Sequence, residues 1–273
     1  MPRRQPDLTQ PFRALHAPGR LLILPNAWDA GSAAIVAACG AEAVATTSAG
    51  LAWSRGYPDG NAIPVSVLHA AIGEIVRAIS VPLTVDIEAG YTDAPDGVAE
   101  LVAALADAGA VGVNIEDGAD APDLLCAKIA AIRRAAGTGV FVNARTDVYL
   151  RRLVPAERAV AETLDRGRRY RQAGGDGLFV PGVSVATEIR AIAEGIGDLP
   201  LNVMALSRLP PAAELRSLGV RRLSAGAALA SAAYGRTRRL ATEFLRDGSS
   251  ERFAEDAAGY AEMNALFAGA RGR

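Results

Sequence analysis

The chain has 273 residues, half of them hydrophobic, and a formal net charge of −1. This length suits a single α/β barrel, and the hydrophobic content is enough for one large core. The balanced charge argues against nucleic acid as a partner, because phosphate binding needs a basic surface. Two cysteines exclude a disulfide scaffold and predict a reducing, cytoplasmic location. No apolar run reaches the roughly 20 residues that cross a membrane, so we expect no membrane partner.

Short apolar runs alternate with alanine-rich segments of helical character along the chain. We expect strands at residues 21–24, 43–47, 81–87, 112–116, 140–145, 177–180, 201–205 and 220–224. We expect helices at residues 8–16, 31–39, 65–80, 96–108, 123–136, 155–173, 185–195, 211–218, 227–246 and 250–268. Residues 1–7 should form a flexible arm, and residues 48–62 a long polar loop of the functional kind. Eight strand–helix units without a linker predict one (β/α)8 barrel domain over residues 1–273.

Charged residues gather where the expected strands end. The third strand ends in Asp86 and Glu88, which can share one face because alternate strand residues point the same way. Two acids there are costly to bury unless something pairs with them. Oxygen-rich side chains favour a hard divalent cation, Mg²⁺ before Zn²⁺.

Two further strands repeat the pattern. The fourth strand ends in Glu116 and Asp117, and the fifth ends in Arg145 and Asp147. In α/β barrels the chemistry lies at the carboxyl ends of the strands. The repetition therefore predicts a polar site above an apolar core.

Six segments together resemble those of the isocitrate lyase/phosphoenolpyruvate mutase superfamily, in the family's order. They read LPNAWD (24–29), TTSAG (46–50), GYPD (56–59), VDIEAGY (85–91), NIED (114–117) and NARTD (143–147). The resemblance implies a (β/α)8 barrel that often exchanges its last helix with a neighbouring subunit. Residues 227–273 would then make the contacts of a homodimer or homotetramer. It also implies Mg²⁺, with Mn²⁺ as a substitute, and small 2-oxo or 2-hydroxy carboxylate substrates.

The resemblance also implies roles for individual residues. Asp86 matches the direct Mg²⁺ ligand, and Glu88 and Glu116 match acids that hold the metal's water molecules. The expected catalytic set is Arg145, which would grip substrate oxygens, Glu116, and Asp59 on a mobile gating loop. The expected substrate-binding residues are Trp28, Asp29, Thr47, Ser48, Ala49 and Asn202.

Several of these residues have simpler interpretations. Asp86 and Glu88 could be helix caps or salt-bridge members, and Arg145 could be a structural partner of Asp147. Asn202 could bridge buried hydrogen bonds instead of touching a ligand. We interpret the arginines at 166–171 as a solvated helix face.

The chain departs from the family after the fourth strand. Isocitrate and methylisocitrate lyases carry a Lys-Lys-Cys-Gly-His motif there, whose cysteine is the catalytic acid. Residues 118–126 read GADAPDLLC instead, and Cys126 lies in an apolar helical context. The lyases' Glu after the sixth strand and the mutases' gating loop with Lys and Asn are also missing. These losses argue against methylisocitrate cleavage and against phosphorus–carbon chemistry.

The remaining residues can bind metal and stabilise an oxyanion. We expect a Mg²⁺-dependent carbon–carbon lyase or decarboxylase for an oxaloacetate-like 2-oxo dicarboxylate, with an enolpyruvate-type intermediate. Decarboxylation fits because CO₂ leaves without a strong acid, and hydrolytic cleavage of the same compounds is the nearest competing hypothesis. Three further hypotheses stay open, namely isocitrate or methylisocitrate lyase activity, phosphonomutase activity, and a barrel that binds a dicarboxylate without turnover.

Overall fold

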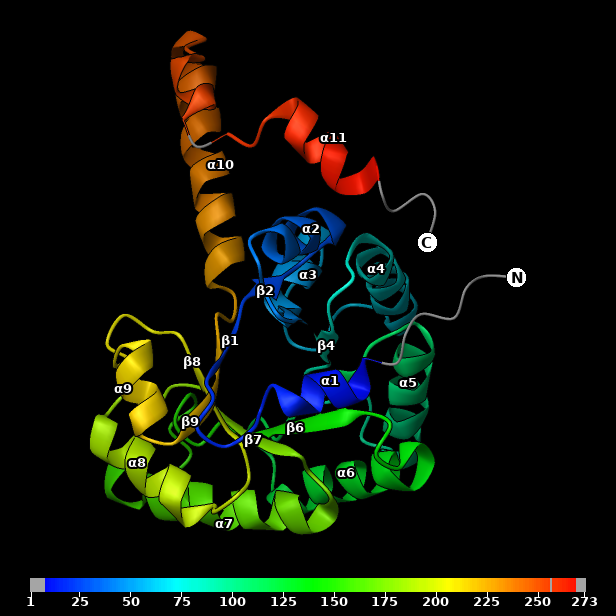
Figure 1. Ribbon diagram of the computed structural model, residues 1–273, viewed down its shortest axis with the longest axis vertical. Helices are drawn as coiled ribbons and strands as arrows, with labels where there is room; N and C mark the ends of the chain where they lie inside the picture. Colours follow the sequence, from blue (N-terminus) through cyan, green and yellow to red (C-terminus); the bar gives the residue numbers. More distant parts are fainter. Residues whose placement is uncertain (1–7, 256, 269–273) are drawn as a thin grey trace.

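The computed structural model describes residues 8–255 and 257–268, so the expected arm at 1–7 lies outside the described residues. All strands of these ranges belong to one parallel sheet of nine segments (Figure 1). The first two segments are consecutive parts of one strand that is interrupted at Pro25, which has no N–H to donate. One part pairs with the last strand and the other with the third segment, which closes the sheet. The predicted (β/α)8 barrel is confirmed.

The strands and helices follow the expected order with small shifts at their ends. The strands are β1 (Leu22–Leu24), β2 (Asn26–Ala27), β3 (Val44–Thr46), β4 (Leu83–Asp86), β5 (Gly112–Glu116), β6 (Phe141–Arg145), β7 (Gly177–Val180), β8 (Leu201–Met204) and β9 (Val220–Ser224). The α-helices are α1 (Thr9–Ala14), α2 (Ala30–Ala38), α3 (Ser48–Ser54), α4 (Val65–Ala78), α5 (Pro95–Asp107), α6 (Pro122–Ala136), α7 (Ala156–Ala173), α8 (Ala186–Gly195), α9 (Ala212–Ser217), α10 (Ala228–Asp247) and α11 (Tyr260–Ala268). In the described part of the chain, none of the helices is both long and apolar enough to cross a bilayer.

Two apolar cores hold the barrel together. The larger one lies between the strands and the surrounding helices, and the strands read as nearly continuous buried runs. A smaller cluster contains Phe12 from α1 with Leu22, Leu24 and Phe141 of the strands. Since the strands are buried on both faces, most of their side chains are apolar, and the charged Asp86, Glu116 and Arg145 each end a strand.

Two sequence expectations were wrong. The first part of the expected 48–62 loop is the helix α3, because Leu51 and its alanine neighbours are buried. Gly50 permits this packing, since a Cβ there would lie 2.7 Å from the Thr47 side chain and 3.0 Å from Trp28 and Ala230. The expected single helix at 250–268 is split into a 3-10 turn (η1, Glu251–Ala254) and α11, with non-helical residues 257–259 before Tyr260.

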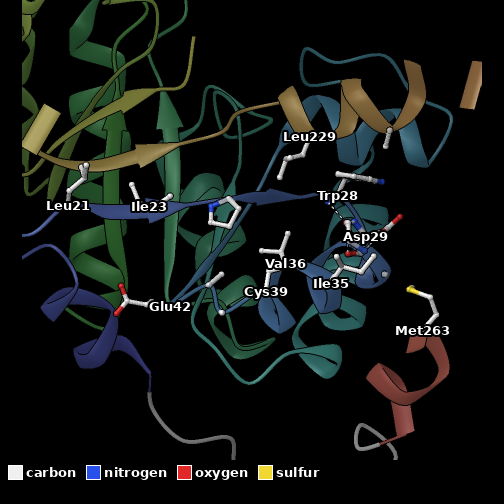
Figure 2. Close-up of a pocket in the computed structure, with 16 residues that line it drawn as sticks. Leu21, Ile23, Trp28, Asp29, Ile35, Val36, Cys39, Glu42, Leu229 and Met263 are labelled. Atoms are coloured by element: carbon white, nitrogen blue, oxygen red, sulfur yellow. Dashed lines mark hydrogen bonds between the residues drawn. The ribbon is translucent and has the colours of Figure 1, made fainter. Parts of the chain in front are cut away.

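The outer face of β1 is open. In Figure 1, α10 follows β9 but projects away from the barrel, and Ala230 is its one buried residue. A cavity of about 810 Å³ runs along α2 and β1, where Ile23 is 52% exposed. Figure 2 shows Ile35 and Val36 of α2 on this cavity, with Met263 of α11 at its edge. We call this apolar cavity the β1 groove.

His16 is a buried neutral group beneath the barrel. Its ring stacks on Phe141 with 4.4 Å between the centroids, and its Nδ1 lies 3.0 Å from the Phe12 carbonyl oxygen. Burial lowers the pKa of His16 from 6.5 to about 3, and the positive charge of Arg222 lowers it further. The unfolded chain therefore binds a proton below pH 6.5 that the folded chain excludes.

This difference predicts a loss of stability as the pH falls below 6.5. The His16 contribution should approach about 1.4 kcal/mol per pH unit, whereas it should be absent above pH 7. We expect His16→Phe to remove it, which urea denaturation of both proteins at pH 7, 6 and 5 would measure. Parallel pH profiles for the two proteins would contradict this account.

Candidate active site

The strand register brings the expected acids and the arginine to one rim of the barrel. Asp86 at the end of β4 pairs with Asn114, and Glu116 at the end of β5 pairs with Arg145 at the end of β6. Parallel neighbours end at the same edge, so three successive strands contribute charged side chains there. Asp86, Glu116 and Arg145 are therefore brought together as predicted.

Arg145 is held by carboxylates on two sides. Its Nε donates to Asp147 Oδ1 at 2.7 Å, and its Nη2 donates to Asp147 Oδ2 at 3.0 Å. Its Nη1 lies 2.6 Å from Glu116 Oε2. Asp147 is fully buried, and it also accepts from Arg151 Nε at 2.9 Å. Paired bonds of this kind fix the plane of the guanidinium group.

Burial dominates the electrostatics of the acids. It raises the pKa of Glu116 to about 8, although the charge of Arg145 acts in the opposite direction. Burial also raises the pKa of Asp86, again against Arg145. Asp86 Oδ1 accepts the Glu88 N–H at 3.1 Å, and the Asp86 N–H donates to Thr46 Oγ1 at 2.9 Å.

Glu88 joins two loops. Its Oε1 accepts from the Tyr91 hydroxyl at 3.0 Å, and its Oε2 accepts from the Asn61 backbone N–H. All three residues have a positive φ, an arrangement that costs energy and is concentrated at functional sites. Asp59 lies on the same loop as Asn61 and is exposed. Burial is the main cause that raises the pKa of Glu88, and the negative charge of Asp59 raises it further.

The acids of the rim can be compared with what a Mg²⁺ site requires. Over residues 8–255 and 257–268, no three His, Cys, Asp or Glu side chains form a ready-made cage. Glu116 is paired with Arg145, and Glu88 with Asn61 and Tyr91. Asp86 is a half-buried carboxylate with no ion pair in the same ranges. This donor set fits Mg²⁺, which often takes one or two carboxylates and keeps several water molecules.

The expected substrate-binding residues divide into three groups. Thr47, Ser48 and Ala49 lie at the end of β3 and the start of α3. Asp29 caps α2 by accepting the Ser32 N–H at 2.7 Å, and Trp28 lies beside Tyr234 of α10 with 6.5 Å between the ring centroids. Both residues also line the β1 groove, as Figure 2 shows. Ligand contact by these five residues stays a prediction.

Asn202 makes bridging hydrogen bonds inside the barrel, and ligand contact by this residue also stays a prediction. It is 1% exposed, its Oδ1 accepts from Asn143 Nδ2 at 3.0 Å, and its Nδ2 donates to the Val203 carbonyl at 2.8 Å. Its hydrogen bonds therefore link the interior faces of β6 and β8.

Sequence reasoning missed a buried cation inside the barrel. Arg222 of β9 is 1% exposed, and its Nη2 donates to Asn114 Oδ1 at 3.0 Å. Its Nε and Nη1 have no hydrogen-bond partner among the described residues. Burial lowers the pKa of Arg222 to about 9, although the negative charge of Asp86 acts to raise it. The sequence does not indicate this role, because the adjacent Arg221 is an identical residue that is more exposed.

The interpretation of 166–171 as a solvated face was wrong for Arg166. Its guanidinium is buried, and its Nη1 donates to Asp117 Oδ2 at 2.8 Å. Tyr170, one turn later, is fully buried and donates its hydroxyl to the same oxygen at 2.6 Å. Arg169 fits the expectation better, because it pairs with the exposed Asp123. The one cue was the i, i+4 spacing of Arg166 and Tyr170.

A closed parallel barrel with acids and an arginine at its strand ends defines the (β/α)8-barrel class of enzymes. The family model of phosphoenolpyruvate phosphomutase matches residues 12–245. An uncharacterised protein of Mycobacterium tuberculosis is 38% identical over 219 residues, which cover 79% of this chain and 81% of that protein. The chain therefore belongs to the phosphoenolpyruvate mutase/isocitrate lyase superfamily, whose matched members are carbon–carbon lyases and mutases.

Solved structures and named relatives agree with this membership. A Burkholderia cenocepacia structure, provisionally assigned as a lyase or mutase, is 40% identical with a TM-score of 0.86, covering 97% of this chain and 96% of that chain. The 2-methylisocitrate lyase of Halalkalibacterium halodurans is 28% identical over 71% of this chain and 67% of that enzyme. The oxaloacetate decarboxylase of Rhodopseudomonas palustris is 32% identical over 152 residues, half of each chain.

The two kinds of ion pair in this region predict different effects on stability. Asp147→Asn should lower the free energy of unfolding by about 3 kcal/mol, because it removes the fully buried charge that pairs with Arg145 and Arg151. Asp123→Asn breaks an exposed pair with Arg169 and should change it by less than about 1 kcal/mol. Urea denaturation at pH 7 measures both values. Equal losses in the two variants would contradict the buried position of Asp147.

Proposed function

We propose that the protein is a Mg²⁺-dependent carbon–carbon lyase or decarboxylase for a small, oxaloacetate-like 2-oxo dicarboxylate. The observation that carries this proposal is that Asp86 and Arg145 lie at the same rim of the barrel. They end β4 and β6, the two strands that pair with β5. One is a half-buried acid without an ion pair in the described ranges, and the other is a guanidinium fixed by Asp147. Together they offer a cation site and an anion site for one oxygen-rich ligand.

The roles of the chain's own residues follow from these positions. Asp86 would hold the metal, while Glu88 and Glu116 would orient its water molecules. When bound, Mg²⁺ supplies Lewis-acid stabilisation of negative charge on the ligand's oxygens. Arg145 would bind the 2-oxo carboxylate end through hydrogen bonds assisted by charge. Asp59, on the loop that Asn61 ties to Glu88, would close the site.

Decarboxylation asks little more of the site. The bond between C3 and the departing carboxylate breaks, and its electron pair moves toward the ketone oxygen. This leaves an enolpyruvate-type intermediate whose charge Arg145 can neutralise. CO₂ leaves without a proton, and a solvent proton then adds to C3 to give pyruvate. No strong acid is needed at the leaving group.

The loop after β5 supports this choice over methylisocitrate cleavage. It is short, and Arg166 Nη1 donates to the Asp120 carbonyl at 3.2 Å and so ties the loop to α7. Cys126 packs against the large core from α6, and burial raises the pKa of its thiol. A thiol of this kind is a poor candidate for the missing catalytic acid.

Named proteins of the superfamily, which differ in their sequence identity to this chain, add support. The Rhodopseudomonas relative acts on oxaloacetate, although it matches half of this chain. A phosphonopyruvate hydrolase with the same fold, 24% identical, was solved with oxalate and Mg²⁺. A Burkholderia cenocepacia structure provisionally assigned as a phosphonomutase is 41% identical. For this reason, phosphonopyruvate turnover is the second candidate activity.

Asp86→Ala should abolish metal-dependent turnover while leaving the fold intact. We expect the wild-type protein with Mg²⁺ to release pyruvate and CO₂ from oxaloacetate faster than Mg²⁺ alone does. Neither 2-methylisocitrate nor phosphonopyruvate should be turned over, and a chelator should stop the reaction. Circular dichroism of the variant is the control for folding. Unchanged turnover in Asp86→Ala would contradict the role of Asp86 as the metal ligand. Turnover of phosphonopyruvate alone would favour the second candidate activity.

We also propose that a second copy of the chain covers the β1 groove with its C-terminal helices, in a homodimer or homotetramer. The groove is apolar, and α10 projects from the barrel with large apolar side chains exposed. Leu245 is 84% exposed, and Phe244, Phe253 and Tyr260 are exposed as well. Apolar surfaces of this extent usually mark an interface.

The single-domain boundaries and the cytoplasmic location stay predictions. Two free cysteines support the cytoplasmic location.

Ile35→Glu should break this assembly, because it places a charge in the groove. Light scattering coupled to gel filtration should give an oligomer for the wild type and a monomer for the variant. Val65→Glu is the matched control, since Val65 is similarly exposed but lies outside the groove. A monomeric wild type, or an oligomeric Ile35→Glu variant, would argue against the covered groove.

A further inference from the structure

A buried carboxylate behind the rim connects α7 to the arginine. Asp117, directly after β5, is 3% exposed and accepts three hydrogen bonds. Its Oδ2 accepts from Tyr170 Oη at 2.6 Å and from Arg166 Nη1 at 2.8 Å. Its Oδ1 accepts the backbone N–H of Asp147 at 2.9 Å. Both oxygens of Asp117 are therefore occupied, and their donors come from two elements.

Helix α7 presents its two donors in a fixed position. Arg166 and Tyr170 are four residues apart, so they lie on one face of the helix. Gly167 lies between them, where a Cβ would come within 2.7 Å of the Leu178 side chain of β7. Glu162, one turn earlier, accepts from Arg166 Nε at 2.7 Å. The close helix–strand contact and this second ion pair leave little freedom to either donor.

The chain of contacts ends at Arg145. The N–H that Asp117 binds belongs to Asp147, whose carboxylate makes both bonds to the Arg145 guanidinium. Asp147 is fully buried, so water cannot replace a bond that is lost there. A shift of Asp117 would therefore move the Asp147 peptide and turn the guanidinium plane. Such a shift of a binding group by a fraction of an ångström weakens the binding of an oriented ligand.

We propose that Arg166 and Tyr170 are positioning residues that set the orientation of Arg145 through Asp117 and Asp147. The inference rests on the proposed role of Arg145 as the group that binds the substrate's oxygens. Neither residue touches the ligand. Buried ion pairs of this kind contribute little net stability, so a gain in geometric precision is the stronger reason for their presence.

Tyr170→Phe tests the proposal because it removes one hydroxyl and keeps the ring. The probe is oxalate, with Mg²⁺ present, in calorimetric titrations of the full chain. We expect the variant to bind oxalate about tenfold more weakly, because Asp117 then fixes the Asp147 peptide less firmly and Arg145 is less well oriented for the ligand. Arg166→Gln should act in the same direction. Arg169→Gln, on the same helix but in an exposed pair, should bind oxalate like the wild type.

A double-mutant cycle separates positioning from a general structural role. In an Arg145→Lys background, which lacks the paired bonds to Asp147, Tyr170→Phe should weaken oxalate binding no further. The melting temperature of each variant reports any general structural loss separately from the change in affinity. An equal loss of affinity in both backgrounds, or no loss in either, would overturn the proposal.

A second readout works without a ligand. The Nε–H of Arg145, assigned in ¹⁵N NMR spectra by its loss in Arg145→Lys, should exchange with solvent slowly in the wild type and faster in Tyr170→Phe.

The outcomes separate the two proposals. Absence of oxalate binding by the wild type would count against the proposed function, and the exchange rate of the Arg145 Nε–H would then decide the positioning role. Oxalate binding without oxaloacetate turnover would contradict the decarboxylase alone. Unchanged exchange and affinity in Tyr170→Phe would overturn the positioning role whatever the turnover.

Discussion

The buried ion pair between Arg145 and Asp147 is the contact on which the rest of the site depends. It fixes a guanidinium at the end of β6 with two hydrogen bonds, and it leaves the Nη1 of the group beside Glu116. A free arginine side chain at this rim would sample many rotamers, and ordering them on binding would weaken the affinity for a ligand. The barrel removes this loss in advance, because Asp147 is itself anchored by Asp117.

The other charges at the rim follow from the need to balance this arrangement. Asp86, Glu88, Glu116 and Asp147 are crowded acids, and burial raises the pKa of the first three. Glu116 and Asp147 are compensated by Arg145, and Glu88 by hydrogen bonds. Asp86 has Arg222 as a buried electrostatic neighbour but no ion pair over the described residues. A divalent cation at Asp86 would complete the balance, which is the physical reason for expecting Mg²⁺ there.

The sequence predicts this fold well because apolar runs that end in acids are unusual and repeat at three strands. The positions of Asp86, Glu116 and Arg145 follow from that pattern, since parallel neighbours end together. Long-range partners could not be predicted in the same way. Arg166 looks like one of several surface arginines, and Arg222 directly follows the less buried Arg221, from which the sequence alone does not distinguish it. The helix α3 was missed because its short, Gly-containing segment has weak helical periodicity, and burial against the barrel decides its conformation.

The central claim is that Asp86, through a metal ion, and Arg145 bind the same ligand. A crystal structure of the protein with Mg²⁺ and oxalate would test this claim most directly. The account predicts a metal ion bound by the Asp86 carboxylate, with water molecules between it and Glu88 and Glu116. Oxalate should bridge this ion and the Arg145 guanidinium, which should keep both bonds to Asp147. A metal ion bound elsewhere, or oxalate away from Arg145, would contradict the account.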